Sequence, residues 1–147
     1  MNQPHFRYPL LAFTSDLDMW VFESEEELTT CGPLTLRDHM QDGMEVVDAE
    51  GRSWRVRSMR RLGPARISLR TILRRLSKIE HLWEELPSLT LAELKDRVCA
   101  SVAAHADCQL HFPDDTAELA ARQADVRAAD SIAAICELSG LDNFTGY

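Results

Sequence analysis

Apolar residues form short runs or alternate with polar ones in the first half of the chain, and recur at helical spacing in the second half. Residues 8–13 and 19–22 are two apolar runs around an aspartate-rich turn, which predicts a β-hairpin. Residues 44–48 and 53–57 flank a second turn, and their apolar positions alternate as in a half-buried strand. Gly51 supplies the positive φ that a tight turn requires, so the sequence predicts a second hairpin here.

Three stretches carry the start signals of helices. Residues 24–27 (Ser-Glu-Glu-Glu) form a capping box and predict a short helix that reaches about Cys31, where Gly-Pro stops it. Thr90 with Glu93 forms another capping box, which predicts a helix over 91–105. Asp115 caps an expected last helix over 116–139, and Gly140 follows as its C-terminal stop.

The stretch from 66 to 86 is ambiguous between helix and strand. Apolar residues at spacings of three and four favour a helix over 68–78. Ile79, His81 and Trp83 alternate with more polar neighbours, so either a helix or a last strand is open for 79–86.

The order of these elements predicts the fold class. Strands dominate residues 8–60 and helices dominate residues 90–140, a segregation typical of α+β proteins. We therefore expect one domain over residues 1–147, in which an antiparallel sheet of hairpins is packed by C-terminal helices. At 147 residues the chain has the size of one domain and can fold without disulfides or a metal.

Composition points to a cytoplasmic location. The four cysteines are widely spaced, unlike a secreted disulfide scaffold. The first residues are polar rather than those of a signal peptide, and no apolar run approaches the roughly 18 residues that span a bilayer. We expect free thiols, no membrane association and no cofactor.

Charge is divided into two blocks along the chain. Residues 14–50 hold eleven carboxylates against one base, Arg37, whereas residues 52–78 hold ten bases and no acid. The blocks either pair with each other or create a surface field of two signs, which steers partners. The net charge of −8 makes nucleic-acid binding through 52–78 the less favoured interpretation.

Catalytic signatures are absent from the sequence. It has no nucleophile-elbow motif, no phosphate-binding glycine loop and no local Cys–His pattern of a catalytic family. His105, Cys108 and His111 have metal-like spacing, but a clear fourth ligand is missing, and the alternative is a helix end with a buried thiol. We expect no metal and no enzymatic activity.

Several segments resemble bacterial proteins of the toxin-immunity type. They are Tyr-Pro-Leu-Leu-Ala-Phe at 8–13, Trp-Val-Phe-Glu-Ser at 20–24 with the Glu-rich helix after it, the hairpin at 47–56 and the start of the capped helix at 89–95. The likeness covers about residues 8–97. It implies a cytoplasmic protein, made beside a secreted toxin, that inactivates the toxin by stoichiometric binding and has no catalytic residues. It also implies a strand over 77–86, and it offers no counterpart for the last helix.

The leading functional hypothesis is therefore an immunity-type inhibitor that occludes a basic toxin domain sterically and electrostatically. The expected contact residues are acidic: Asp16, Asp18, Glu23, Glu25, Glu26, Asp48 and Glu50. An adaptor or regulatory module that uses the same surface for another protein is the alternative. Trp20 or Trp54, if exposed, would add a binding hot spot, although both are expected in the core.

Overall fold

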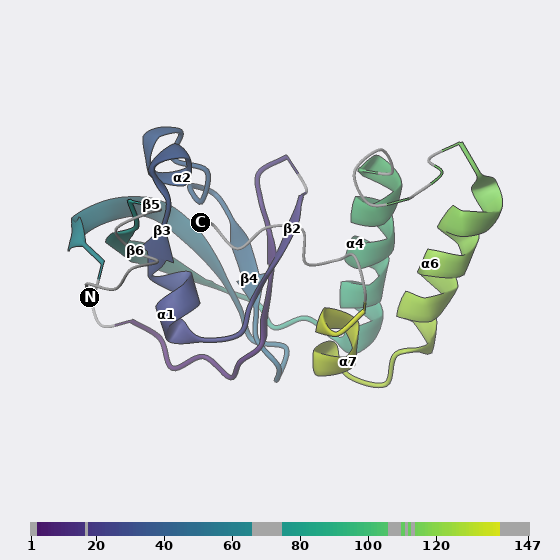
Figure 1. Cartoon of the computed structure of the whole chain (residues 1–147). Helices are drawn as coiled ribbons and strands as arrows, with labels where there is room; N and C mark the ends of the chain where they lie inside the picture. The colour runs from purple at the N-terminus through teal and green to yellow at the C-terminus, as the bar shows by residue number, and fades with distance from the viewer. Residues whose placement is uncertain are drawn as a thin grey trace.

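A curled antiparallel sheet of six strands forms the centre of the molecule (Figure 1). The computed structural model describes residues 3–16, 18–65, 75–105, 110, 112 and 114–138. The strand order is β2-β1-β4-β5-β6-β3. The strands are β1 (Leu10–Phe13), β2 (Met19–Phe22), β3 (Thr30–Cys31), β4 (Glu45–Val47), β5 (Ser53–Pro64) and β6 (Ser77–Leu86). The helices are α1 (Glu25–Leu28), α2 (Pro33–Arg37), α4 (Leu91–Ala104), α6 (Thr116–Ala128) and α7 (Ile132–Cys136).

The predicted α+β class and both predicted hairpins are confirmed. β1 pairs with β2 so that Leu10 lies opposite Phe22, and β4 pairs with β5 around the turn that holds Gly51 at φ +85°. β1 and β2 are entirely apolar because both of their faces are covered. Leu11 packs on the helix side of the sheet, whereas Leu10 packs on the opposite side.

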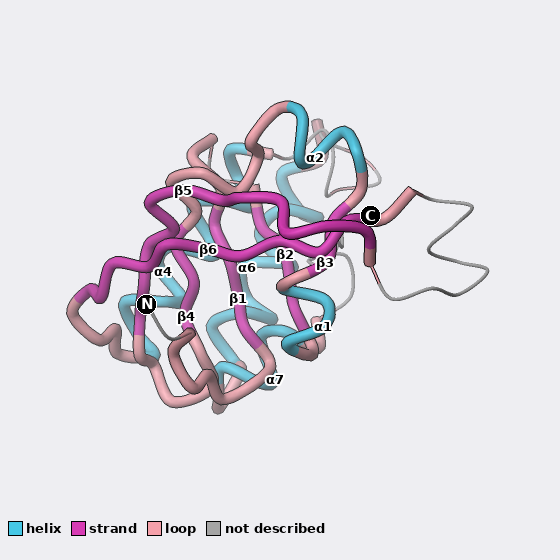
Figure 2. Tube along the Cα trace, turned by 90° about the vertical axis from the view of Figure 1, so that its left-hand side faces the viewer, coloured by secondary structure: helices cyan, strands magenta, loops and turns pink. Residues whose placement is uncertain are grey.

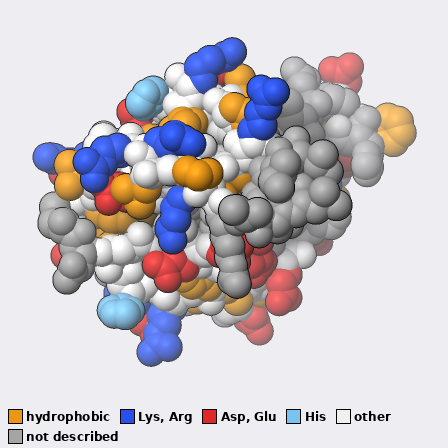
Figure 3. Space-filling view, turned by 60° about the vertical axis from the view of Figure 1, so that its left-hand side comes forward, with side chains coloured by type: hydrophobic (Ala, Val, Ile, Leu, Met, Phe, Trp, Pro, Cys, Tyr) orange, Lys and Arg blue, Asp and Glu red, His pale blue; other side chains and the backbone are white. Residues whose placement is uncertain are grey.

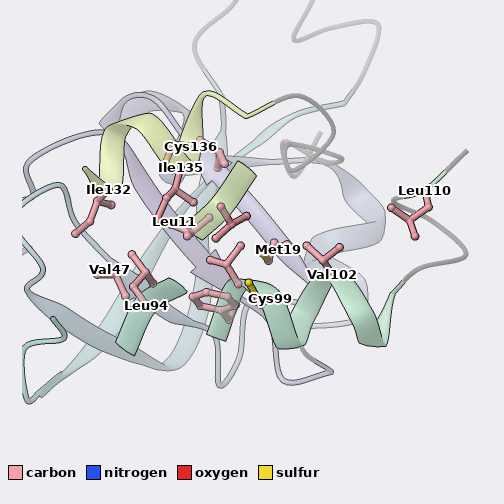
Figure 4. Packing of buried hydrophobic residues seen from close by; sticks show 14 residues of the cluster. Leu11, Met19, Val47, Leu94, Cys99, Val102, Leu110, Ile132, Ile135 and Cys136 are labelled. Carbon is pink, nitrogen blue, oxygen red and sulfur yellow. The ribbon is translucent and has the colours of Figure 1, made fainter. Parts of the chain in front are cut away.

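Helices α4 and α7 cover one face of the sheet, and α6 packs against α4 on the side away from the strands (Figure 1). The capping box of α4 forms as predicted, with Thr90 accepting a hydrogen bond from the Glu93 amide. Leu94 of α4 and Ile135 of α7 join Leu11 and Val47 in one buried cluster (Figure 4). Burying such side chains against the sheet stabilises the fold by about 1.5–3 kcal/mol each.

The predicted single helix over 116–139 is wrong, because the segment forms two helices. α6 ends at Ala128, Ala129 is extended, and the Ser131 side chain caps α7 by accepting from the Ala134 amide. The break lets Ile132 and Ile135 enter the core, which a straight continuation of α6 would not allow. Gly140 lies outside the described residues.

The ambiguous stretch 79–86 is a strand. β6 pairs with β5 from Ser77 to Leu86, and residues 75–76 are not helical either, so the expected helix is wrong at residues 75–78. Residues 66–74 lie outside the described part. Ile79 and Trp83 point into the core on alternate positions, and Trp83 lies opposite Val56. Pairing with β5, which is distant in the sequence, thus determines the conformation of a segment whose local pattern is compatible with both helix and strand.

The first short helix also ends earlier than expected. α1 stops at Leu28, because Thr30 and Cys31 pair with Lys78 and Ser77 of β6 as strand β3. The Gly-Pro that follows begins α2, with proline in its first turn, where a missing N–H costs nothing.

The curl of the sheet encloses a second apolar cluster. β5 and β6 cross in front of β1 and β4 in the turned view (Figure 2), and the enclosed side chains include Trp20, Trp54 and Trp83. Phe6 packs edge-on against both Trp54 and Trp83. Trp20 and Trp54 are therefore core residues and not exposed hot spots. In the described residues, no helix has the length and apolar character needed to cross a bilayer.

Candidate protein-binding surface

Asp48 is a structural residue of the β4–β5 turn. Its side chain is fully buried, and its carboxylate accepts hydrogen bonds from the amides of Arg7, Glu50 and Arg52. The Arg52 guanidinium adds an ion pair at 2.8 Å. The prediction that Asp48 contacts a partner is corrected here, because its oxygens are fully engaged by its own chain and have no surface to offer.

Glu50 lies beside Asp48 and is exposed, but it is not a free charge. Its carboxylate is 3.4 Å from the Arg7 guanidinium and 3.6 Å from that of Arg52. Glu50 therefore belongs to a local ion-pair group at this turn, where two arginines offset the acids.

Glu45 is a further acid that the sheet uses internally. It is 2.7 Å from Arg55 of β5 and 2.7 Å from Arg97 of α4, so it links the sheet to the helical layer. Burial opposes its ionisation, but the two arginines outweigh burial and hold the Glu45 pKa below its ordinary value. The acidic and basic blocks thus pair with each other at Glu45, Asp48 and Glu50.

Asp16 and Asp18 lie in the β1–β2 turn. Asp16 is exposed, and its pKa is lowered chiefly by a hydrogen bond from the Thr14 hydroxyl. The His105 ring lies 2.8 Å from the Asp16 carbonyl oxygen, which ties this turn to the end of α4. The Asp18 carboxylate accepts from the Met19 amide at 2.9 Å and from the indole of buried Trp20 at 3.4 Å. Asp16 is therefore the more available of the two.

Glu23, Glu25 and Glu26 surround the start of α1, and all three are exposed. Ser24 caps the helix by accepting from the Glu27 amide, while the Glu27 carboxylate accepts from the Glu23 amide at 2.7 Å. Within the described residues, none of the three carboxylates has a lysine or arginine in ion-pair range. We call these three residues the α1 acidic surface.

The predicted acidic positions do not form one surface. Leu10 lies opposite Phe22 and Phe13 opposite Met19, so the β1–β2 turn and the start of α1 are at opposite ends of the hairpin. The three steps of about 3.3 Å between the four residues of each strand put roughly 10 Å between the two ends. Asp16 thus lies at one end of the hairpin, and the α1 acidic surface lies at the other.

The arginines of β5 are largely paired across the strands. Arg60 contacts Glu80, and Arg55 and Arg57 both lie 3.5 Å from Glu84. Figure 3 shows basic side chains on this side of the molecule with hydrophobic ones among them, and exposed Leu62 and Leu82 belong to β5 and β6. A mixed surface of this kind lacks the uniform positive stripe of a phosphate-binding site.

A polar group is buried inside the curl of the sheet. The His81 ring lies 2.5 Å from the Gln41 side-chain oxygen and packs 5.0 Å from the Trp83 ring. Burial lowers the pKa of His81 to about 4, so the ring is neutral at physiological pH. The three cysteines in the described residues, Cys31, Cys99 and Cys136, are buried, and Cys31 and Cys99 are free thiols.

The metal-like motif receives no support from the described residues. His105 contacts the Asp16 carbonyl, and Cys108 and His111 lie outside the described part. Among the described residues, no three His, Cys, Asp or Glu side chains are grouped so as to hold a metal ion.

Comparison with known proteins adds no assignment. No family model matches the chain, and no curated protein or solved structure matches it significantly. The residues of this chain are therefore the only basis for assigning a function.

Proposed function

We propose that the chain is a non-catalytic, immunity-type inhibitor that acts in the cytoplasm and binds a basic toxin domain. The inhibitor presents the α1 acidic surface to the positive region of the toxin and blocks it sterically and electrostatically. Such complementarity raises the association rate and selects the partner.

One observation carries this proposal. The structure neutralises Glu45, Asp48 and Glu50 with its own arginines, whereas in the described residues the α1 acidic surface has no basic partner. The helix dipole also stabilises acids in the first turn of α1. Glu23 precedes the helix, so the dipole stabilises its charge little. Three unpaired carboxylates at one exposed point therefore support a contact with an external cation.

The alternative function, an adaptor for another protein, would use the same surface. The inhibitor and the adaptor differ in stoichiometry and in effect, because an inhibitor binds one partner tightly and abolishes the activity of that partner. Nucleic-acid binding through 52–78 is less favoured, because Arg52, Arg55 and Arg60 are engaged by acids of the same chain.

If a basic toxin domain is encoded next to the gene of this chain, as the proposal expects, titrating the chain into that domain tests the proposal. We expect toxin activity to fall linearly to zero at one equivalent, and E25K/E26K to need a large excess. D114K/D125K is the matched control, because it reverses two exposed acids in the C-terminal helical region and should inhibit like the natural chain. Toxin activity that persists at several equivalents would exclude the immunity role.

A further inference from the structure

β6 has an open edge. One edge of β6 pairs with β5 from Ser77 to Leu86. At the opposite edge, β3 pairs only with Ser77 and Lys78. The Thr29 carbonyl then accepts from the Ile79 amide at 2.8 Å. From residue 80 to 86, no backbone or side-chain group of the described residues bonds to this edge. An unpaired edge presents N–H and C=O groups that another strand can bind.

The α1 acidic surface adjoins the beginning of this open edge. Thr29 directly follows the last residue of α1, and it bonds to Ile79, the residue before Glu80. Figure 2 shows α1 beside β3 where β3 meets β6. A strand bound along 80–86 would therefore run toward Glu25 and Glu26.

The outward side chains of the open edge alternate between acid and apolar. Glu80 and Glu84 bind arginines of β5, and between them Leu82 is 43% exposed. A strand carboxylate in this fold can hold two arginines at once, as Glu45 does with Arg55 and Arg97 at 2.7 Å each. Glu80, which contacts one arginine, can likewise accept a second cation from a strand on its open side. Glu84 already has Arg55 and Arg57 at 3.5 Å each, so a cation on its open side would compete with these two arginines.

We propose that the open edge of β6 accepts a β-strand of the partner, with basic residues opposite Glu80 and Glu84 and an apolar residue opposite Leu82. This inference rests on the proposed function and specifies how the basic partner binds. Main-chain hydrogen bonds would hold the strand, and the alternating side chains would select it.

The same charges disfavour a second copy of the chain as the occupant in the register centred on Leu82. Two copies of β6 paired antiparallel about Leu82 would place Glu80 of each copy opposite Glu84 of the other. Like charges directly opposite each other destabilise a strand pair. A basic partner strand removes this repulsion, so the edge fits a different protein.

A synthetic nine-residue peptide tests the inference on the full chain. It carries lysine, leucine and lysine at alternate central positions with threonine between them. We expect amides within 80–86 to exchange with deuterium at least about tenfold more slowly when the peptide is bound. A control peptide with methylated central amide nitrogens cannot form the ladder and should give no protection. No protection at 80–86, or equal protection by the control, overturns the inference.

A variant separates this site from the α1 acidic surface. L82K, at an exposed position, replaces the apolar contact with the peptide leucine by a lysine that lies diagonally between the two peptide lysines, so peptide protection should fall at least about tenfold while the fold persists. L34K, at an exposed position of α2, is the matched control and should keep the protection. If E25K/E26K impairs toxin inhibition while the peptide leaves 80–86 unprotected, this inference fails and the proposed function stands. If the peptide protects 80–86 but no toxin is inhibited, the strand site stands and the proposed function fails.

Discussion

The carboxylate of Asp48 accepts hydrogen bonds from both the backbone amide and the guanidinium of Arg52, at 3.0 Å each. This pair closes the β4–β5 turn from inside the protein. The Asp48 carboxylate also accepts a hydrogen bond from the amide of Arg7, 41 residues earlier, and so holds the N-terminal segment against the sheet. Asp48, which the sequence predicts as a partner contact, is instead part of the hydrogen-bonded framework of the fold.

Replacing Asp48 should therefore destabilise the fold. D48A leaves the amides of Arg7, Glu50 and Arg52 without an acceptor, and we expect unfolding in urea to require about 3 kcal/mol less free energy. E50A removes only two exposed ion pairs, with Arg7 and Arg52, and should change stability by at most about 0.5 kcal/mol. Equal effects of the two substitutions would contradict the structural role of Asp48.

Gly51 in the same turn should tolerate no side chain. Its φ is +85°, and a Cβ atom would lie 2.6 Å from the Leu89 carbonyl oxygen. We expect G51A to lower the free energy of unfolding by about 2 kcal/mol or more. The matched control is G63A, because nothing lies within 4 Å of a Cβ built there. If G63A cost as much as G51A, the close approach to Leu89 would not be the cause.

Local signals predicted much of this fold. The apolar runs of β1 and β2, the Gly51 turn and the Thr90–Glu93 cap depend on neighbouring residues, and all formed as expected. Residues 79–86 stayed ambiguous because a distant strand, β5, decides their conformation. The break after α6 depends on which side chains the sheet can bury, and this is not a local property.

The candidate site was harder to predict, for the same reason. Charge along the sequence could not show that Arg7 would engage Asp48, or that strand length would separate Asp16 from the α1 acidic surface. The open edge of β6 had one local signal, the alternation of Ile79, His81 and Trp83. That signal indicated a strand but not which of its edges would remain free.

Stability should fall in mild acid because of His81. Its pKa in the fold is about 4, whereas a histidine in an unfolded chain has a pKa near 6.5. Between these values the unfolded chain binds the proton and the fold does not. The contribution of His81 is therefore fully present above about pH 6.5 and is lost as the pH falls toward 4.

We expect urea unfolding at pH 7 and pH 4.5 to show this loss, on the order of 2 kcal/mol, in the natural chain. H81Q cannot titrate, so it should lack that part of the pH dependence, whereas H5Q, at an exposed position, should retain it. An unchanged pH dependence in H81Q would show that His81 is protonated as easily in the fold as in the unfolded chain.

The association rate between the chain and the basic toxin domain proposed as its partner, measured against ionic strength, tests the central claim most directly. We predict that E23K/E25K/E26K associates at least about tenfold more slowly than the natural chain at low salt, because electrostatic steering is lost. The difference should shrink toward zero near 1 M salt, where charges are screened within about 3 Å. Equal association rates at low salt would contradict the claim that the α1 acidic surface recognises a basic partner.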